Sequence, residues 1–268
     1  MRRRSMLAGV ATAVGGMIAA GSGSAGASGR SPLSGYRLVN LAHVNDPDRT
    51  NVYPGDPAFT LTTVTTVPEH GFYLQYAQQG EHTGTHWGAP AHFNDDQPYA
   101  DELDAEDLFL AAVKIDVRQQ AARDADYEVS VADLQRWEKQ HGRIPNEAAV
   151  VLWTGWEDRW GTPAFFNYDA AGQMHQPGFS LEAVQWLVNT GRLGRRGALG
   201  TDTFSPESAL DAEYQVSKLL YREHRISLEI LANLAELPPT GAHILVGGTV
   251  NRRGSGSPAS IYAFVPKR

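Results

Sequence analysis

The stretch His82-Thr-Gly-Thr-His86-Trp-Gly-Ala-Pro90-Ala-His92-Phe93 decides how this chain is interpreted. It places three of the chain's nine histidines within eleven residues. Imidazole is the commonest metal ligand in proteins, and its ordinary pKa lies close to neutral pH. The glycines and the proline between the histidines favour a tight turn over a helix face. The stretch therefore predicts a metal-centred or acid–base site, with stray surface histidines as the alternative.

The composition describes an acidic chain without cysteine. Its 268 residues carry a formal net charge of −7, which becomes −10 when the three arginines of residues 1–27 are removed. An acidic chain is a poor partner for nucleic acid or for anionic membranes. The lack of cysteine excludes disulfides, thiolate metal ligands and a cysteine nucleophile. We therefore expect a small-molecule substrate, no nucleic-acid partner and no membrane anchor.

The first 27 residues have the pattern of an export signal. Arg2-Arg3-Arg4 form a basic start, residues 8–20 are weakly apolar, and Ala25-Gly26-Ala27 fits a cleavage site. The paired arginines favour the twin-arginine route, with an ordinary secretory signal as the alternative. The sequence thus predicts a signal peptide over 1–27 and a single domain over 28–268. It also predicts that the protein is exported, to the cell envelope or the extracellular space.

Strands and helices alternate in the middle of the chain, while strands dominate both ends. Two helices are expected to begin after Ser130 and Ser180, which have the residue type of helix caps, and a third lies within 210–222. The expected strands are 36–44, 72–78, 111–117, 148–153, 198–203 and 226–230, with a closing hairpin of 243–250 and 261–265 around the loop 251–258. This order predicts an α/β domain with a mixed sheet.

Several motifs together make the chain similar to the cyclase-like metal-dependent hydrolases. That family includes kynurenine formamidases (arylformamidases), isatin hydrolases and proteins first named as polyketide cyclases. The stretch 82–93 resembles the family signature H-x-G-T-H-x-D-x-P-x-H-F. The likeness continues, in family order, in Val151-Leu-Trp-Thr-Gly-Trp156, Pro177-Gly-Phe-Ser-Leu-Glu-Ala183, Gly200-Thr-Asp202-Thr-Phe-Ser205 and the segment from Glu229 to Leu234. The resemblance implies a swivelling β/β/α cyclase-like fold and one divalent metal, Zn²⁺ or Mn²⁺.

The resemblance also implies roles for individual residues. His82 and His86 correspond to metal ligands, and His92 to a further ligand or a proton carrier. Glu229 corresponds to a later family glutamate, and it is our candidate for the general base. A bound divalent ion lowers the pKa of its water and polarises a carbonyl. His92 would then protonate the leaving nitrogen.

Two positions depart from the family pattern. Gly88 stands where the family has a ligating aspartate, and Ser217 stands where many members have another histidine. The sequence leaves open whether Asp95, Asp96, Asp202 or His224 supplies a substitute ligand. Restoring the carboxylate with Gly88→Asp is expected to raise metal affinity. Two further residues, Trp87 and His175, are possible substrate contacts.

The predicted activity is hydrolysis of a C–N bond in a small aromatic or cyclic amide, arylformamidase-like in type. Because two ligand positions are lost, two alternatives stay open. One is a metal-free polyketide-type cyclase that uses His92 and Glu229 as acid and base. The other is a protein that binds a small molecule without hydrolysing it. Family members commonly form homo-oligomers, and the resemblance implies the same here.

Overall fold

The computed structural model describes residues 32–267, and Gly35–Arg268 form one compact unit. The predicted signal peptide lies outside the described residues. Among the residues that are described, no helix is long and apolar enough to cross a membrane.

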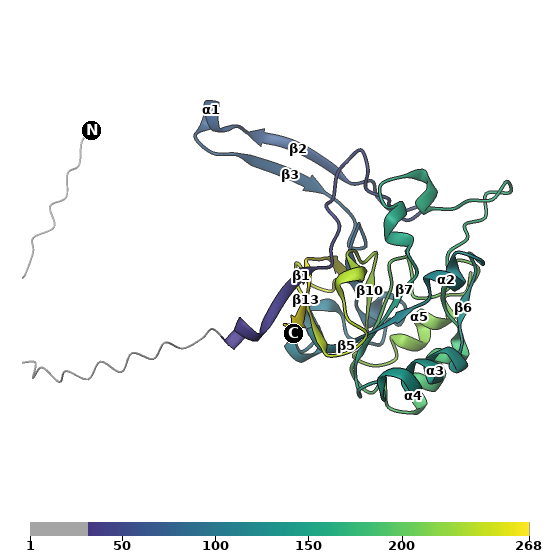
Figure 1. Cartoon of the computed structure of the whole chain (residues 1–268). Coiled ribbons are helices and arrows are strands. Elements are labelled where there is room, and N and C mark those ends of the chain that lie inside the picture. Colours follow the sequence, from purple (N-terminus) through teal and green to yellow (C-terminus); the bar gives the residue numbers. More distant parts are fainter. Residues whose placement is uncertain (1–31, 268) are drawn as a thin grey trace, which may run out of the picture. The chain divides into compact units, whose positions relative to one another are not determined.

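The unit is built on a mixed sheet of nine strands (Figure 1). Four central strands run parallel, and the strands on either side of them pair antiparallel. In sheet order they are β1 (Tyr36–Asn40), β13 (Ile261–Pro266), β11 (Ala242–Val246), β5 (Phe109–Asp116), β7 (Ala149–Trp153), β9 (Ala198–Gly200), β10 (Ile226–Glu229), β4 (His86–Gly88) and β12 (Gly256–Pro258). The predicted α/β class with a mixed sheet is confirmed.

Both long helices begin where the sequence predicts. Ahead of α3 (Val131–His141), the hydroxyl of Ser130 accepts a hydrogen bond from the Asp133 backbone N–H, while the Asp133 carboxylate accepts one from the Ser130 N–H. Ser180 caps α4 (Leu181–Asn189) by accepting a hydrogen bond from the Ala183 N–H. The shorter helices are α1 (Val67–His70), α2 (Arg118–Ala121), α5 (Gln215–Leu220) and the 3-10 turns Pro32–Gly35, Pro90–His92, Ala100–Glu102, Ala105–Leu108, Trp156–Arg159, Pro163–Phe165 and Leu234–Glu236.

The buried strand β7 shows how the core is divided. All five of its residues are buried, as a continuous apolar run predicts for a strand covered on both faces. Val150 and Leu152 pack with residues of α3, α4 and α5, whereas Ala149 and Val151 pack in a second core with residues of β10, β11 and β13. Side chains alternate across a strand, so one run of five residues supports two cores.

Several local features differ from the predictions. The strands expected over 198–203 and 243–250 end at Gly200 and Val246, and the stretch predicted as a tight turn contains β4. β1 ends at Asn40 instead of continuing to residue 44, and the helix expected within 210–222 covers only α5. Tyr214, just before α5, has a left-handed φ of 53°, so a helix cannot continue backwards through it. The loop 251–258 contains β12, which pairs with β4 at the far edge of the sheet. Its Gly-Ser-Pro sequence has little strand preference, which is why the sequence does not reveal it.

β2 (Thr60–Thr65) and β3 (Leu74–Gln78) form a separate antiparallel hairpin with α1 at its tip. Figure 1 shows this hairpin extending away from the nine-stranded sheet. None of the residues in the two strands is buried. A short parallel pair, β6 (Glu128–Val129) and β8 (Gly178–Phe179), completes the strands of the described residues.

Candidate active site

The pairing of β4 with β10 brings His86 and Glu229 together. The register sets His86 opposite Glu229 and Gly88 opposite Ser227. Because alternate residues of a strand share a face, these four positions lie side by side on one face of the sheet. His86 Nε2 is 3.2 Å from Glu229 Oε2, and both residues are buried. Two of the predicted site residues are therefore neighbours across the two strands.

Each of the first two histidines is anchored through one ring nitrogen. His86 donates from Nδ1–H to the backbone oxygen of Gly84, 2.9 Å away. Ser255 donates its hydroxyl hydrogen to the Glu81 carboxylate at 2.9 Å, so His82 Nε2, which lies 2.9 Å from the same hydroxyl, must carry the hydrogen and donate it. The anchors leave His82 Nδ1 and His86 Nε2 as the ring nitrogens without an anchor, and His86 Nε2 faces Glu229.

His82 and His86 offer these two nitrogens to a divalent cation beside Glu229. Among the described residues, the ligand atoms of the histidine cluster and Glu229 do not form a group of three within 4.8 Å of one another, so a cation held by three of them would have to draw them closer together. His86 Nε2 is buried and faces the Glu229 carboxylate. Burial disfavours the charged ring, but the negative charge of Glu229 outweighs it and raises the pKa of His86, so a cation at this point would take the place of the Nε2 proton. Burial, followed by the nearby rings of His86 and His92, lowers the pKa of His82 to about 2, so His82 is neutral at pH 7. A neutral imidazole with its second nitrogen anchored, next to a carboxylate, is a typical ligand arrangement for zinc or manganese.

His92 completes the histidine cluster from the more exposed side. Its ring stacks on His82 with centroids 3.9 Å apart, and the His82 ring meets His86 edge-on at 4.9 Å. Burial lowers the pKa of His92, while the negative charge of Glu229 opposes that shift. The structure thus brings together all four residues that the sequence places at the site.

Two glycines make room for this arrangement. A Cβ at Gly256 would lie 2.8 Å from Cε1 of His82 and 2.3 Å from the backbone oxygen of Trp87. A Cβ at Gly88 would lie only 2.1 Å from the hydroxyl oxygen of Tyr221, which is fully buried. That hydroxyl donates to Ser227 Oγ at 2.7 Å, and the Gly88 N–H donates to the same oxygen at 3.1 Å. In this chain, Tyr221 and Ser227 fill the space beside position 88.

Ser217, the second departure from the family pattern, is bound to a buried carboxyl group. Its backbone N–H and its hydroxyl donate to Glu207, at 3.0 and 2.8 Å, and Ser205 donates to the same carboxyl. Glu207 is only 3% exposed. Burial raises its pKa to about 7, and the charge of Glu229 acts in the same direction. Serine at 217 therefore supports a carboxyl group instead of offering an imidazole.

The four site residues open onto a cavity of about 260 Å³. Its size is near the lower end of small-molecule sites. Its remaining lining is formed by four aromatic rings, one hydroxyl and one carboxylate: Tyr53, Phe93, Phe204, Tyr214, Ser205 and Asp56. Aromatic walls around imidazole and carboxylate groups suit a small planar substrate with a polar bond to be broken.

The two predicted substrate contacts do not line this cavity. Trp87 is 1% exposed and packs in the core, because the residue after His86 in β4 points to the opposite face of the sheet. His175 lies 2.7 Å from Asp126 and 3.6 Å from Asp169, and it takes part in a surface ion-pair group. Neither position supports the predicted contact.

The candidate replacement ligands also lie elsewhere. Asp202 is fully buried and accepts hydrogen bonds from the N–H and the hydroxyl of Thr154, at 3.0 and 2.7 Å. This pair joins the ends of two neighbouring strands. Asp95 and Asp96 are exposed in the segment after His92 and do not line the cavity.

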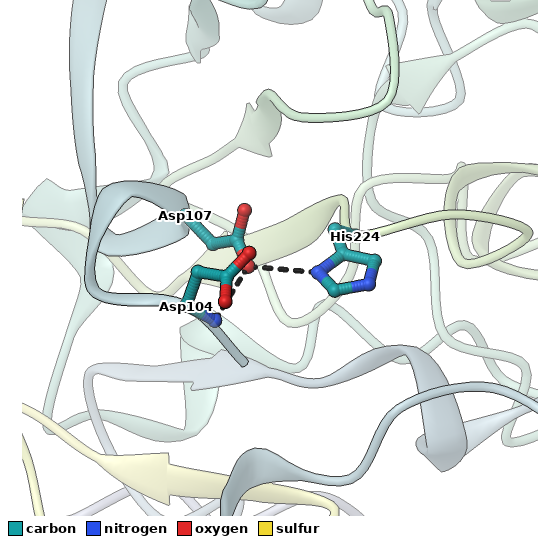
Figure 2. A group of neighbouring side chains, drawn as sticks. All are labelled: Asp104, Asp107 and His224. Atoms are coloured by element: carbon teal, nitrogen blue, oxygen red, sulfur yellow. Dashed lines mark hydrogen bonds and ion pairs between the residues drawn. The ribbon is translucent and has the colours of Figure 1, made fainter. Parts of the chain in front are cut away.

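His224 belongs to a different cluster, shown in Figure 2, where it faces Asp107. Metal ligands in proteins are mostly histidine and carboxylate side chains. Within residues 32–267, a group of three of these whose ligand atoms lie within 4.8 Å of one another is formed only by Asp104, Asp107 and His224. Two guanidinium groups already pair with these acids: Arg196 lies 2.8 Å from Asp107, and Arg195 lies 3.5 Å from Asp104. These arginines balance the charge that would otherwise attract a cation.

Sequence reasoning missed several residues of the site. Tyr53, Asp56 and Tyr214 lie outside regular strands and helices, where no periodic pattern marks them. Ser255, the anchor of His82, lies in the Gly/Ser-rich loop. Glu81 had a signal, since it directly precedes the histidine motif, and the cavity residues Phe93, Phe204 and Ser205 lie within the quoted motifs.

Comparison with known proteins gives the class. Residues 39–208 match the family described as "Putative cyclase", and the chain belongs to this family. The chain is 34% identical over 194 residues to isatin hydrolase of Roseibium aggregatum. The aligned stretch covers 70% of this chain and 73% of that protein.

Solved structures agree with this assignment. Isatin hydrolase A from Labrenzia aggregata, bound to benzyl benzoate, matches with a TM-score of 0.80 and 32% identity, over 87% of this chain and 95% of that one. Isatin hydrolase A from Ralstonia solanacearum matches with a TM-score of 0.77 and 34% identity, over 86% and 92%. A structure described as a potential metal-dependent hydrolase with cyclase activity shares the fold, at 15% identity and a TM-score of 0.64. The predicted cyclase-like fold is confirmed.

The contact between Gly88 and Tyr221 changes the outcome expected for Gly88→Asp. The new Cβ would collide with the Tyr221 hydroxyl, so we expect a loss of about 2 kcal/mol or more in the free energy of unfolding. Adding Tyr221→Phe removes the clashing oxygen and should recover part of that loss. Urea unfolding of the wild type, the single variants and the double variant measures both effects. Full stability of the Gly88→Asp single variant would contradict this prediction.

The raised pKa of Glu207 predicts a pH-dependent stability. The folded protein binds this proton more tightly than the unfolded chain, whose carboxyl has a pKa near 4.5. The stability due to Glu207 is therefore complete below about pH 4.5 and is lost as pH rises towards 7, by roughly 3 kcal/mol. Glu207→Gln should reduce the difference between urea midpoints at pH 5 and pH 8. The exposed control Glu182→Gln should leave that difference unchanged.

Proposed function

We propose that this protein hydrolyses the C–N bond of a small cyclic amide fused to an aromatic ring. The carrying observation is the buried His86–Glu229 pair, with Nε2 and Oε2 3.2 Å apart, at the wall of a cavity lined with aromatic rings. Two relatives at 32% to 34% identity are named isatin hydrolases, and isatin is such an amide. N-formyl anilides, the arylformamidase substrates, are the second substrate class to be tested.

In the proposed hydrolysis, the four site residues have different roles. His82 Nδ1 and His86 Nε2 would hold one Zn²⁺ or Mn²⁺, which would supply a water of lowered pKa and polarise the substrate carbonyl. Glu229, buried on the sheet face, accepts a proton from the attacking water. His92, on the more exposed side of the cluster, gives a proton to the leaving nitrogen. The aromatic walls hold the ring of the substrate in the cavity.

The metal and the chemistry are tested in one set of variants. The full chain is loaded with Zn²⁺ or Mn²⁺, dialysed, and assayed for bound metal and for ring opening of isatin. His86→Ala should lose the metal and lower kcat/KM by about 100-fold or more. His141→Ala, an exposed histidine at the end of α3, is the matched control and should change neither.

Three outcomes would decide between the functional hypotheses. Ring opening without retained metal would support metal-free acid–base chemistry by His92 and Glu229 and would rule out the cation. Hydrolysis of N-formyl anilides but not of isatin would move the substrate class to arylformamides. Failure of the metal-loaded protein to open either substrate would refute the hydrolase proposal and leave the binding protein.

We also propose that the chain forms a homo-oligomer through the β2–β3 hairpin. The hairpin exposes apolar side chains and has two unpaired strand edges, which are favourable for pairing with a second copy about a two-fold axis. A two-stranded hairpin alone is marginally stable in water, so cover by a second copy would stabilise it. The exposed apolar residues are Val64, Val67, Phe72, Tyr73, Leu74 and Tyr76.

Light scattering on the purified full chain tests this association. The double variant Leu74→Asp with Tyr76→Asp should shift the particle mass to that of a monomer, because charges cannot be buried unpaired in a contact. Leu210→Asp, a substitution at an equally exposed leucine outside the hairpin, should not change the mass. A monomeric wild type would show the proposal to be wrong.

A further inference from the structure

A second, smaller cavity adjoins the candidate active site. It measures about 40 Å³ and shares Tyr53, Phe204, Ser205 and Tyr214 with the larger cavity. A space of this size holds about one water molecule or one small substituent. It is too small for a ring, so it extends the larger cavity without being a separate site.

Two tyrosines stand between the cavities. The hydroxyl oxygens of Tyr53 and Tyr214 are 3.0 Å apart, and one donates to the other. Each ring is held from behind: Tyr53 meets Phe204 edge-on at 5.5 Å, and Tyr214 packs on Phe93 at 5.1 Å. Tyr214 also has a left-handed backbone, which is costly for a residue other than glycine. Its main chain is thereby constrained, so any separation of the two hydroxyls is a movement of side chains.

The tyrosine pair has hydrogen-bonding capacity left over. Two hydroxyls carry two hydrogens, and their mutual bond uses one of them. Neither hydroxyl has another hydrogen-bond partner among residues 32–267. The remaining O–H and the remaining lone pairs are thus available to a polar group that enters between the rings.

The smaller cavity is polar at its inner end. Glu207, Gln176 and Ser208 line it, together with Asp211. The side-chain amide of Gln176 already makes two hydrogen bonds. Its N–H donates to the Phe165 carbonyl, and its oxygen accepts from the Phe204 N–H. Glu207 accepts from the hydroxyl of Ser205 and from the N–H and hydroxyl of Ser217. An ionised carboxylate has about four acceptor sites, so above the pKa of Glu207 one site is left for a further donor. The chemistry therefore favours a hydrogen-bond donor of one heavy atom, such as an amino or hydroxyl group.

We propose that Tyr53 and Tyr214 form a partition that sets substrate specificity: when it opens, one small ring substituent, preferably a hydrogen-bond donor, enters the cavity closed by Glu207. The inference rests on the proposed function, because it assumes an aromatic ring in the larger cavity. It identifies the two tyrosines as specificity-determining residues and Glu207 as the group that recognises the substituent.

The test compares isatin with isatins that carry one methyl or one amino group at each ring position. Tyr214→Phe keeps the ring but removes the hydroxyl bond. It should raise kcat/KM for at least one substituted isatin, relative to isatin, by about tenfold. Adding Glu207→Gln should reduce the advantage of the amino over the methyl compound. Tyr262→Phe, an exposed tyrosine on β13, is the control and should leave all ratios unchanged.

Calorimetric titration with the same compounds separates this proposal from the proposed hydrolysis. If the wild type opens isatin but Tyr214→Phe leaves every ratio unchanged, the partition is refuted and the hydrolase stands. If isatin is not opened, the ratios of Kd replace those of kcat/KM and must show the same shift. Absence of binding of every compound to both proteins would also refute the partition.

Discussion

The antiparallel pairing of β4 with β10 is the constraint on which the site depends. A slip of one residue would turn His86 into the core and Trp87 towards the cavity, because side chains alternate along a strand. The register is held from two sides. The Trp87 ring fills the core behind the strand, and β12 pairs with the other edge of β4. The acid–base chemistry therefore depends on packing on the opposite face of the sheet.

The sequence predicts those features that depend on local chemistry or on a whole motif. Ser130 and Ser180 mark helix starts because capping needs only a side chain and the next turn of backbone. His82, His86, His92 and Glu229 could be selected because the motifs resemble a family. The direction of Trp87 could not, since it depends on strand register. Tyr53 and Tyr214 could not either, because their meeting depends on the folding of two distant loops.

The two departures from the family pattern have one physical consequence in common. Beside position 88, the hydroxyls of Tyr221 and Ser227 occupy the space, and at position 217 a serine hydroxyl supports Glu207. In both places, hydrogen bonds between neutral or protonatable groups lie where the family pattern has a metal ligand. The negative charge next to the histidines comes instead from Glu229 on β10, from Glu81, which directly precedes His82, and from Asp56.

The anchor of His82 by Ser255 spans 173 residues of chain. Bringing such distant segments together has an entropic cost, and contacts of this kind favour slow folding. α3 and α4 form from local contacts, but the orientation of His82 awaits the last strand pairings near the C-terminus. A chain that ends before residue 255 would keep both helix starts and lack an aligned imidazole. The orientation of His82 is thereby tied to the docking of the segment around Ser255, so loss of that contact would alter the site while both helices stay intact.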